Sequence, residues 1–192
     1  MDTTEKVPST RERQAQQRRE KIIQAYLLSS FDESVEVLCA SRFGMIKRTN
    51  LKELQVSRSN KTMVCMKIGS LDEMVSVALS YSPDDVVILS SEQGFALSYP
   101  VDQVPQVSCR SKGVKAINLV KDDHVADMIV VSNLDGQLVV VSDTAQMKRI
   151  KTSDIAQVKR PAKGNRICKL VKSNPVKIDR LLSKQLNDVI EF

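Results

Sequence analysis

The chain has 192 residues, is 42% hydrophobic and only 4% aromatic, and carries a formal net charge of +6. Its apolar segments are too short to span a membrane, and its polar, Arg-rich start lacks the apolar core of a signal peptide. Four cysteines without a CxxC pair and a single histidine argue against a zinc site and favour a reduced, cytosolic protein without a metal or cofactor.

Residues 1–19 are predicted to form a basic arm or a short helix. Ser9 followed three residues later by Glu12 is typical of a helix start, because the two side chains can cap each other's backbone N–H groups. From Glu20 onward the pattern of the later repeats begins, and residues 20–25 match residues 72–77 and 123–128. The first ordered strands are therefore expected to be the closing half of a blade whose opening half is missing.

Short runs rich in Val, Ile and Leu then predict β-strands rather than helices, because they are only about four to six residues long and turn signals separate them. These runs cover residues 35–39, 63–66, 74–79, 86–89, 114–117, 128–131, 137–141 and 166–170. A longer stretch, residues 176–182, is expected to be the matching last strand. Glycine, Asp and Pro predict turns at residues 42–44, 82–85, 92–94 and 133–136. Within the last of these, Asp135-Gly136 predicts a β-hairpin between its flanking strands.

One unit recurs every 51 residues, as the spacing of Val56, Val107 and Val158 shows. A lysine follows each valine at a constant distance. With about four strands per unit, this period predicts an all-β, propeller-like array of blades over residues 20–186. About three and a half repeats are expected, with units near 35–85, 86–136 and 137–186, and residues 187–192 as a tail or a closing strand.

Basic residues collect at two positions of the unit. The first follows the hairpin turn and holds Lys47, Arg48, Lys148 and Arg149, whereas the middle copy has Leu97 there. The second is the loop that starts at the repeated valine. Its bases are Arg58, Lys61, Arg110, Lys112, Lys115, Lys159, Arg160, Lys163 and Arg166.

These loops are predicted to bind a polyanion. Arginine offers a planar fork of donors to phosphate oxygens, lysine adds a point charge, and Gly113 and Gly164 would let backbone N–H groups approach. Bases at a fixed period along a curved rim suit bent duplex DNA that is bound without reading its sequence. The low aromatic content argues against a stacking platform for single strands, and no catalytic constellation can be assembled around His124 alone.

Three segments resemble the repeats of the C-terminal domain of the A subunit of bacterial type IIA topoisomerases, namely residues 44–51, 91–101 and 110–119. The resemblance covers roughly residues 20–182 and implies a β-pinwheel, in which neighbouring blades exchange strands and the outer rim binds and bends duplex DNA. It implies further partners, which are the ATPase B subunit and the rest of the A subunit, but no membrane and no small-molecule substrate. It also implies a bacterial, nucleoid-associated protein that is not an enzyme by itself, because the family's catalytic tyrosine lies in the cleavage core.

Within this family the chain is more similar to topoisomerase IV, which relaxes and decatenates DNA, than to gyrase. The gyrase box Gln-Arg-Arg-Gly-Gly-Lys-Gly has no match, and residues 108–113 keep only its Arg and its Lys-Gly. A gyrase A domain that wraps DNA and lacks its first blade stays open as an alternative, since that blade could carry the box. The sequence is also compatible with a protein-interaction propeller and with a regulatory fragment that acts through residues 70–137, whose net charge is −6.

Overall fold

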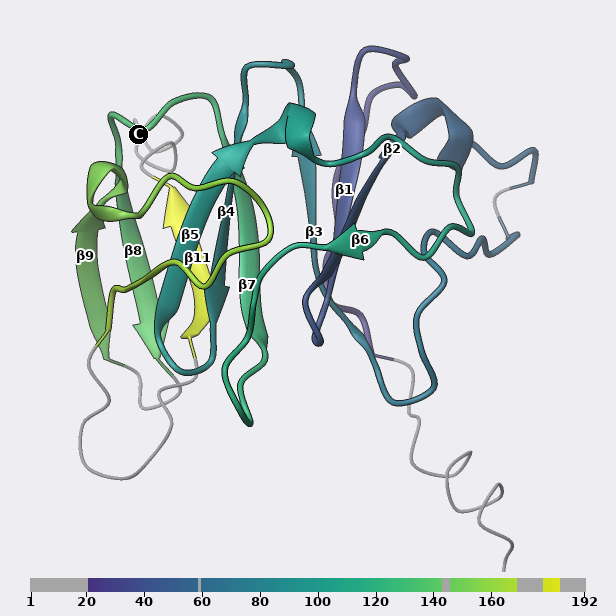
Figure 1. Ribbon diagram of the computed structural model, residues 1–192. Coiled ribbons are helices and arrows are strands. Elements are labelled where there is room, and N and C mark those ends of the chain that lie inside the picture. The colour runs from purple at the N-terminus through teal and green to yellow at the C-terminus, as the bar shows by residue number, and fades with distance from the viewer. Residues whose placement is uncertain (1–20, 59, 143–145, 169–177, 184–192) are drawn as a thin grey trace, which may run out of the picture.

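The computed structural model describes residues 21–58, 60–142, 146–168 and 178–183, which form three antiparallel β-sheets that follow one another along the array (Figure 1). The strands of the first sheet are β1 (Glu36–Ser41), β2 (Met45–Asn50), β3 (Met74–Ser80) and β6 (Val114–Lys115). Those of the second are β4 (Val86–Ser91), β5 (Phe95–Pro100), β7 (Val125–Val131) and β10 (Asn165–Arg166). Those of the third are β8 (Gln137–Ser142), β9 (Met147–Lys151) and β11 (Ile178–Ser183). The all-β prediction is thus confirmed.

Each sheet is built around one hairpin, and these hairpins are β1–β2, β4–β5 and β8–β9. The next strand along the array, β3, β7 or β11, pairs with the first strand of its hairpin and forms the inner side of the sheet. A short 3-10 turn follows each hairpin, and these turns are η1 (Leu51–Leu54), η2 (Val101–Gln103) and η3 (Thr152–Asp154). Among the described residues no helix reaches the length and hydropathy needed to cross a bilayer.

The outer side of the first two sheets is completed by residues of the following repeat. Strand β6 pairs antiparallel with β2, and β10 pairs antiparallel with β5. Eight residues before the start of each of these strands, a parallel bridge joins Arg48 to Gln106 and Ser98 to Gln157. We call residues 105–115 the first covering segment and residues 156–166 the second covering segment. Neighbouring repeats therefore exchange strands, and neither of these two sheets is complete without its successor.

Buried carboxylates hold the hairpin turns in place. Asp72, which precedes β3, accepts hydrogen bonds from the Ser41 hydroxyl (2.6 Å) and the Phe43 backbone N–H (3.0 Å). Asp123, 51 residues later, accepts one from the backbone N–H of Gln93 (2.9 Å). Because each acid belongs to the segment that leads into the inner strand, it ties that strand to the turn of its own hairpin.

Apolar side chains form three clusters in register with the sheets. One lies between the first and second sheets and includes Leu38, Leu89 and Tyr99, and one lies between the second and third and includes Leu138. A third covers the outward face of the first sheet, where Met66 packs with residues of β1 and η1. Burying these faces on one another is the main stabilising contribution of such an array, because a single unit cannot cover its own apolar surface.

Two predicted elements are wrong, and each has a physical reason. Residues 63–66 form no strand, because the segment around Met66 packs over the outward face of the first sheet and no strand of the described residues lies beside it to pair with. Asp135-Gly136 joins two strands that do not pair with each other, since β7 belongs to the second sheet and β8 to the third.

Two further expectations concern the ends of the chain. No strand starts before Glu36 in the described part, so residues 21–25 contribute no strand to the expected closing half of a blade. The predicted arm at residues 1–19 and the predicted tail at residues 187–192 lie outside the described residues.

Candidate nucleic-acid interface

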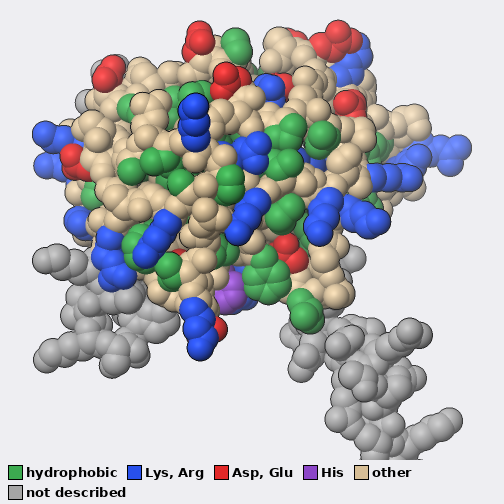
Figure 2. All heavy atoms as spheres, in the orientation of Figure 1, with side chains coloured by type: hydrophobic (Ala, Val, Ile, Leu, Met, Phe, Trp, Pro, Cys, Tyr) green, Lys and Arg blue, Asp and Glu red, His purple; other side chains and the backbone are tan. Residues whose placement is uncertain are grey.

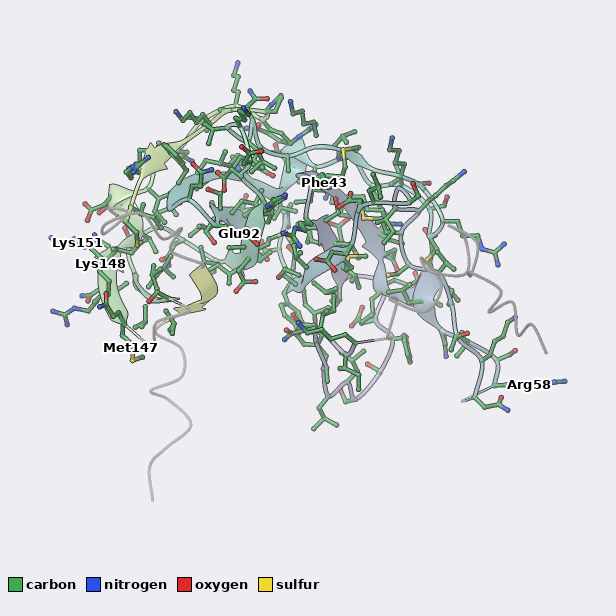
Figure 3. The ribbon with its side chains drawn as sticks, turned by 90° about the horizontal axis from the view of Figure 1, so that it is seen from below. Phe43, Arg58, Glu92, Met147, Lys148 and Lys151 are labelled. Carbon is green, nitrogen blue, oxygen red and sulfur yellow. The ribbon has the colours of Figure 1, made fainter. Side chains whose placement is uncertain are left out.

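The two covering segments cross the same face of the molecule, on the convex side of an arc (Figures 1 and 3). Figure 2 shows Lys and Arg side chains spread over this face, whereas several acidic side chains gather along its upper margin. The first covering segment contributes Arg110, Lys112 and Lys115, all exposed, and the second contributes Lys159, Lys163 and Arg166, all exposed. Six of the predicted bases are therefore brought together on one surface.

The second covering segment holds two of its bases against an aromatic ring. The Lys163 ammonium lies 4.4 Å from the ring centroid of Phe95, and the Arg166 guanidinium carbon lies 4.7 Å from it. The ring itself is only 9% exposed, so it acts as a fixed support on β5. Such cation–π contacts orient both charges without neutralising them, which leaves them able to face an anion.

Arg160 connects the covering segments to each other rather than projecting outward. Its guanidinium donates to the carbonyl oxygens of Gln103 (2.9 Å) and Lys115 (2.9 Å), and the Gln103 side chain accepts from its backbone N–H (3.1 Å). Next to it, the Asn118 backbone N–H donates to the carbonyl of Ala162 (2.8 Å). Arg160 therefore fixes the spacing between the two rows of bases and is a positioning residue of the surface.

Lys47 and Arg48 are not part of this surface, contrary to the sequence-based expectation. The Lys47 side chain is fully buried, and its ammonium donates to the carbonyl oxygens of Ser108 (2.9 Å) and Cys109 (3.2 Å). The Arg48 guanidinium donates to the Val104 carbonyl (2.6 Å) and to a carboxylate oxygen of Glu36 (2.5 Å). Lys47 thus binds the first covering segment to β2, and Arg48 joins β2 to Glu36 of β1 and to the Val104 carbonyl. Neither side chain is therefore available to an external phosphate.

The remaining predicted bases lie at the two ends of the array. Arg58 and Lys61 are exposed on the segment that follows η1, at the end opposite to β9 (Figure 3). Lys148 and Arg149 are exposed on β9, although the Lys148 ammonium donates to the Ile167 carbonyl (2.6 Å). These four bases flank the covering segments and do not lie among them.

The glycines of the covering segments face the protein rather than the outside. Gly113 and Gly164 have φ values of +82° and +76°, and a Cβ would lie 2.5 Å from the Ile46 carbonyl oxygen and 2.0 Å from the Ala96 carbonyl oxygen respectively. Only a residue without a side chain can cross the outer strand so closely. The Lys-Gly pair therefore serves to seat the segment, while the lysine before each glycine stays outside.

Two residues that accompany the predicted bases were not predicted as site residues. Lys151 ends β9 and is exposed beside Arg149 on the same strand face, a position that strict alternation along the strand would have shown. Phe95 was also missed, because a lone aromatic residue at the start of a strand gives no signal that two cations stack on it.

Thiols and the single histidine take other positions. All four cysteines are free. The Cys39 thiol donates a hydrogen bond that lowers the pKa of Cys65 to about 6, and the nearby Lys47 ammonium acts in the same direction. His124 Nδ1 lies 3.2 Å from a Glu92 carboxylate oxygen, and its ring is 5.6 Å from that of Phe43. In the described ranges no group of His, Cys, Asp and Glu is arranged to hold a metal ion.

Comparison with known proteins gives a family match over most of the array. The model of the DNA gyrase C-terminal domain, beta-propeller, matches residues 36–79, 85–132 and 136–172. The A subunit of DNA topoisomerase 4 from Staphylococcus epidermidis is 28% identical over 159 residues, which is 83% of this chain and 20% of that protein. Its counterpart from Bacillus subtilis is 27% identical over 166 residues, which is 86% of this chain and 20% of that protein. The chain thus spans about one fifth of the length of these curated relatives.

Solved structures agree with the fold. The crystal structure of the C-terminal domain of DNA topoisomerase IV superposes with a TM-score of 0.78 at 27% identity, covering 88% of this chain and 52% of that one. The structure of the E. coli ParC C-terminal domain matches with a TM-score of 0.62 at 16% identity, covering 79% of this chain and 62% of that one, a likeness of fold alone. The described array therefore has the β-pinwheel fold that the resemblance implied.

Proposed function

Because this chain belongs to the family of DNA gyrase C-terminal beta-propeller domains, we propose that it binds duplex DNA along the face crossed by its two covering segments. The observation that supports this most directly is the recurrence of exposed bases on neighbouring segments of one face, with Lys112 and Lys163 at the same position of successive repeats. The matched region is the accessory C-terminal domain without the cleavage core, so the chain is not an enzyme by itself.

The chemistry of the face favours contact with phosphates rather than with bases. Lysine and arginine side chains dominate it, and positively charged contacts to phosphate oxygens carry affinity but no sequence information. The arc of the array (Figure 3) presents successive rows of bases along a curved line, so a duplex that follows all of them has to bend. Bending costs elastic energy that the additional phosphate contacts offset.

In the intact protein, this domain would hold a segment of duplex and present it to the cleavage core for relaxation or decatenation. This role rests on the similarity to the A subunit of DNA topoisomerase 4, of which the chain covers only 20%. The partners in that assembly would be the ATPase B subunit and the rest of the A subunit, in the bacterial cytoplasm at the nucleoid. The relatives named above favour this role over DNA wrapping by gyrase.

A salt series tests the proposal. The chain is titrated against a duplex of about 40 base pairs and the matching single strand, and log K is plotted against the logarithm of the salt concentration. The affinity for the duplex is expected to fall steeply as the salt concentration rises, and it should differ little between duplexes of different sequence. The Lys112→Glu chain should bind more weakly and lose about 0.9 of slope for each phosphate contact removed.

Lys121→Glu is the matched control, because it makes the same change of charge at an exposed lysine that lies outside both covering segments. An equal loss in both variants would indicate a general effect of net charge and would contradict a defined binding face. Absence of duplex binding at low salt would overturn the proposal for this chain.

A further inference from the structure

Three of the four cysteines lie close to one buried lysine on the outward side of the first sheet. Cys39 of β1 is directly opposite Lys47 of β2, and its side chain is only 1% exposed. Cys65 belongs to the segment that packs over this face, and it packs against the apolar cluster that contains Cys39. Cys109 lies on the first covering segment, and its carbonyl oxygen accepts from the Lys47 ammonium (3.2 Å). This cluster combines thiols with a fixed positive charge, which is the environment that favours thiolates.

Within the cluster, Cys39 and Cys65 form a hydrogen-bonded pair. The Cys39 thiol donates to the Cys65 sulfur, although the two residues are 26 positions apart in the chain. The Cys109 thiol is engaged elsewhere, because it donates to the Glu53 carbonyl oxygen (3.6 Å). Cys168 belongs to the cluster between the second and third sheets. All four cysteines are free, so the fold brings one pair of thiols together without joining them.

We propose that Cys65 and Cys39 form a redox-sensitive modification site, at which a hydroperoxide such as hydrogen peroxide converts the two thiols into a disulfide. The bond would join β1 to the segment that packs over it, and a thiol reductant would reverse it. Neither cysteine is among the exposed bases of the covering segments, so the site does not depend on the DNA-binding function.

Accessibility decides which sulfur atom reacts first. Cys65 is only half-buried, whereas Cys39 lies beneath its segment and is sealed from solvent. The hydrogen bond from Cys39 lowers the pKa of Cys65 to about 6, and the Lys47 ammonium acts in the same direction. The Cys65 thiolate therefore attacks the peroxide. A sulfur–oxygen bond forms, the O–O bond breaks and hydroxide leaves, which gives a sulfenic acid at Cys65.

Cys39 then completes the reaction. In the reduced chain, its hydrogen bond to Cys65 and its burial raise the pKa of Cys39, so this thiol stays protonated. Oxidation of Cys65 removes the thiolate that accepts this hydrogen bond, and the Lys47 ammonium then favours the Cys39 thiolate. The Cys39 sulfur attacks the sulfenic sulfur. The S–S bond forms, the sulfur–oxygen bond breaks, and the hydroxyl group leaves as water with the Cys39 proton. Over both steps the two sulfur atoms lose two electrons, and the peroxide is reduced to two molecules of water.

The disulfide would also restrain the neighbouring covering segment. The Lys67 backbone N–H, two residues after Cys65, donates to the Ser111 carbonyl oxygen (3.1 Å). A cross-link that closes a loop in the chain opposes opening of the segments that it joins. The backbone amides of residues 66–68 should therefore exchange about tenfold more slowly or less readily still after oxidation, and a reductant should restore their exchange. The amides of β8, which belong to the third sheet, should be unaffected.

Peptide mapping without reduction tests the site. The full chain is treated with hydrogen peroxide in thiol-free buffer and then digested. A linked peptide that holds Cys39 and Cys65 should appear, and it should disappear on reduction. In Cys39→Ser, dimedone should instead label Cys65, because its sulfenic acid has no second sulfur to react with. Cys65→Ser should lose both products. Cys109→Ser is the matched control, since it removes the third thiol of the same cluster and should form the linked peptide at an unchanged rate.

The products of the unaltered chain decide the outcome even where a variant fails to fold, which circular dichroism would reveal. A linked peptide that joins Cys65 to Cys109 would overturn the proposal. Sulfinic acid at Cys65 without any disulfide would overturn it as well, because Cys39 would then not reach the sulfenic acid. A linked peptide whose yield rises with protein concentration would also contradict it, since the bond would join two chains.

Discussion

The buried ammonium of Lys47 donates a hydrogen bond to the carbonyl oxygen of Ser108, a residue 61 positions further along the chain (2.9 Å). Together with the bond to Cys109, this contact fastens the first covering segment to the first sheet. Lys47→Met should therefore leave two carbonyl groups without a donor and lower the free energy of unfolding by about 1–3 kcal/mol. Urea denaturation measures this, and Lys61→Met, which removes an exposed ammonium, should have almost no effect. Equal stability of the two variants would contradict the structural role of Lys47.

Gly164→Ala should detach the second covering segment. The substitution introduces a Cβ 2.0 Å from the Ala96 carbonyl oxygen at a residue whose φ is +76°, so both the contact and the backbone conformation oppose it. A loss of at least about 2 kcal/mol in unfolding free energy is expected. Gly136→Ala is the control, because nothing lies within 4 Å of its Cβ position, and its effect should stay within about 0.5 kcal/mol. If Gly164→Ala lost as little unfolding free energy as Gly136→Ala, the second covering segment would not pack against the Ala96 carbonyl as described.

Tyr99→Phe should leave stability unchanged or raise it by up to about 1 kcal/mol. The Tyr99 hydroxyl is buried and has no hydrogen-bond partner among the described residues, so its removal costs no bond and relieves desolvation. The same burial raises the pKa of Tyr99. Tyr26→Phe is the comparison, because the Tyr26 hydroxyl donates to the Val77 carbonyl (2.6 Å), and its loss should destabilise by about 0.5–1.5 kcal/mol. In calorimetric melting, the midpoint temperature should therefore stay the same or rise for Tyr99→Phe, whereas it should fall for Tyr26→Phe.

Cys65 should be the first cysteine to react with iodoacetamide. The hydrogen bond from the Cys39 thiol and the nearby Lys47 ammonium stabilise its thiolate, and they lower the pKa of Cys65 to about 6. Burial raises the pKa of Cys109 and of Cys168, so these stay protonated at neutral pH. Because the thiolate is the reactive form, labelling of Cys65 should rise as the pH passes upward through about 6 and then level off.

Peptide mapping by mass spectrometry after short labelling times distinguishes the four sites. The variant Cys65→Ser should lose the fast phase, whereas Cys109→Ser should retain it. A fast phase that survives Cys65→Ser, or one whose rate still climbs between pH 8 and pH 9, would contradict the assignment, since an ordinary thiol titrates at about 8.5.

Many strands of the array could be predicted from the local sequence, whereas the wrongly predicted features result from the exchange of strands between repeats. The runs that became β1, β3, β4, β7 and β8 are dense in β-branched residues and bounded by turn signals, so local propensity was sufficient to find them. The role of Asp135-Gly136 was not predictable in this way, because a turn between two strands gives no information on whether those strands belong to one sheet. The strand predicted at residues 63–66 was wrong for a related reason, since a segment forms a strand only where a neighbouring strand is there to pair with it, whatever its β propensity.

The candidate site was predictable for its exposed loops but not for Lys47. A lysine beside a turn is usually solvated, and charge alone gives no sign that this ammonium would find two carbonyl groups inside the fold. One signal was present in the repeat itself, because Leu97 lies three residues after Gly94, just as Lys47 lies three residues after Gly44, and Leu97 is fully buried. A position that holds leucine in one copy is a candidate for facing inward in the others. Comparing repeats position by position therefore helps to separate buried bases from exposed ones.

Because the first two sheets take their outermost strands from the next repeat, the order in which the chain leaves the ribosome matters for its folding. The hairpin β1–β2 ends at Asn50, but β6, which completes that sheet, begins only at Val114. A nascent chain must therefore extend by more than one further repeat before the first sheet can close, and the same delay separates β5 from β10. Pairings over such long sequence separations slow folding. During this interval the edge of β2 stays open, so the growing chain is most exposed to mispairing while its next repeat is still being synthesised.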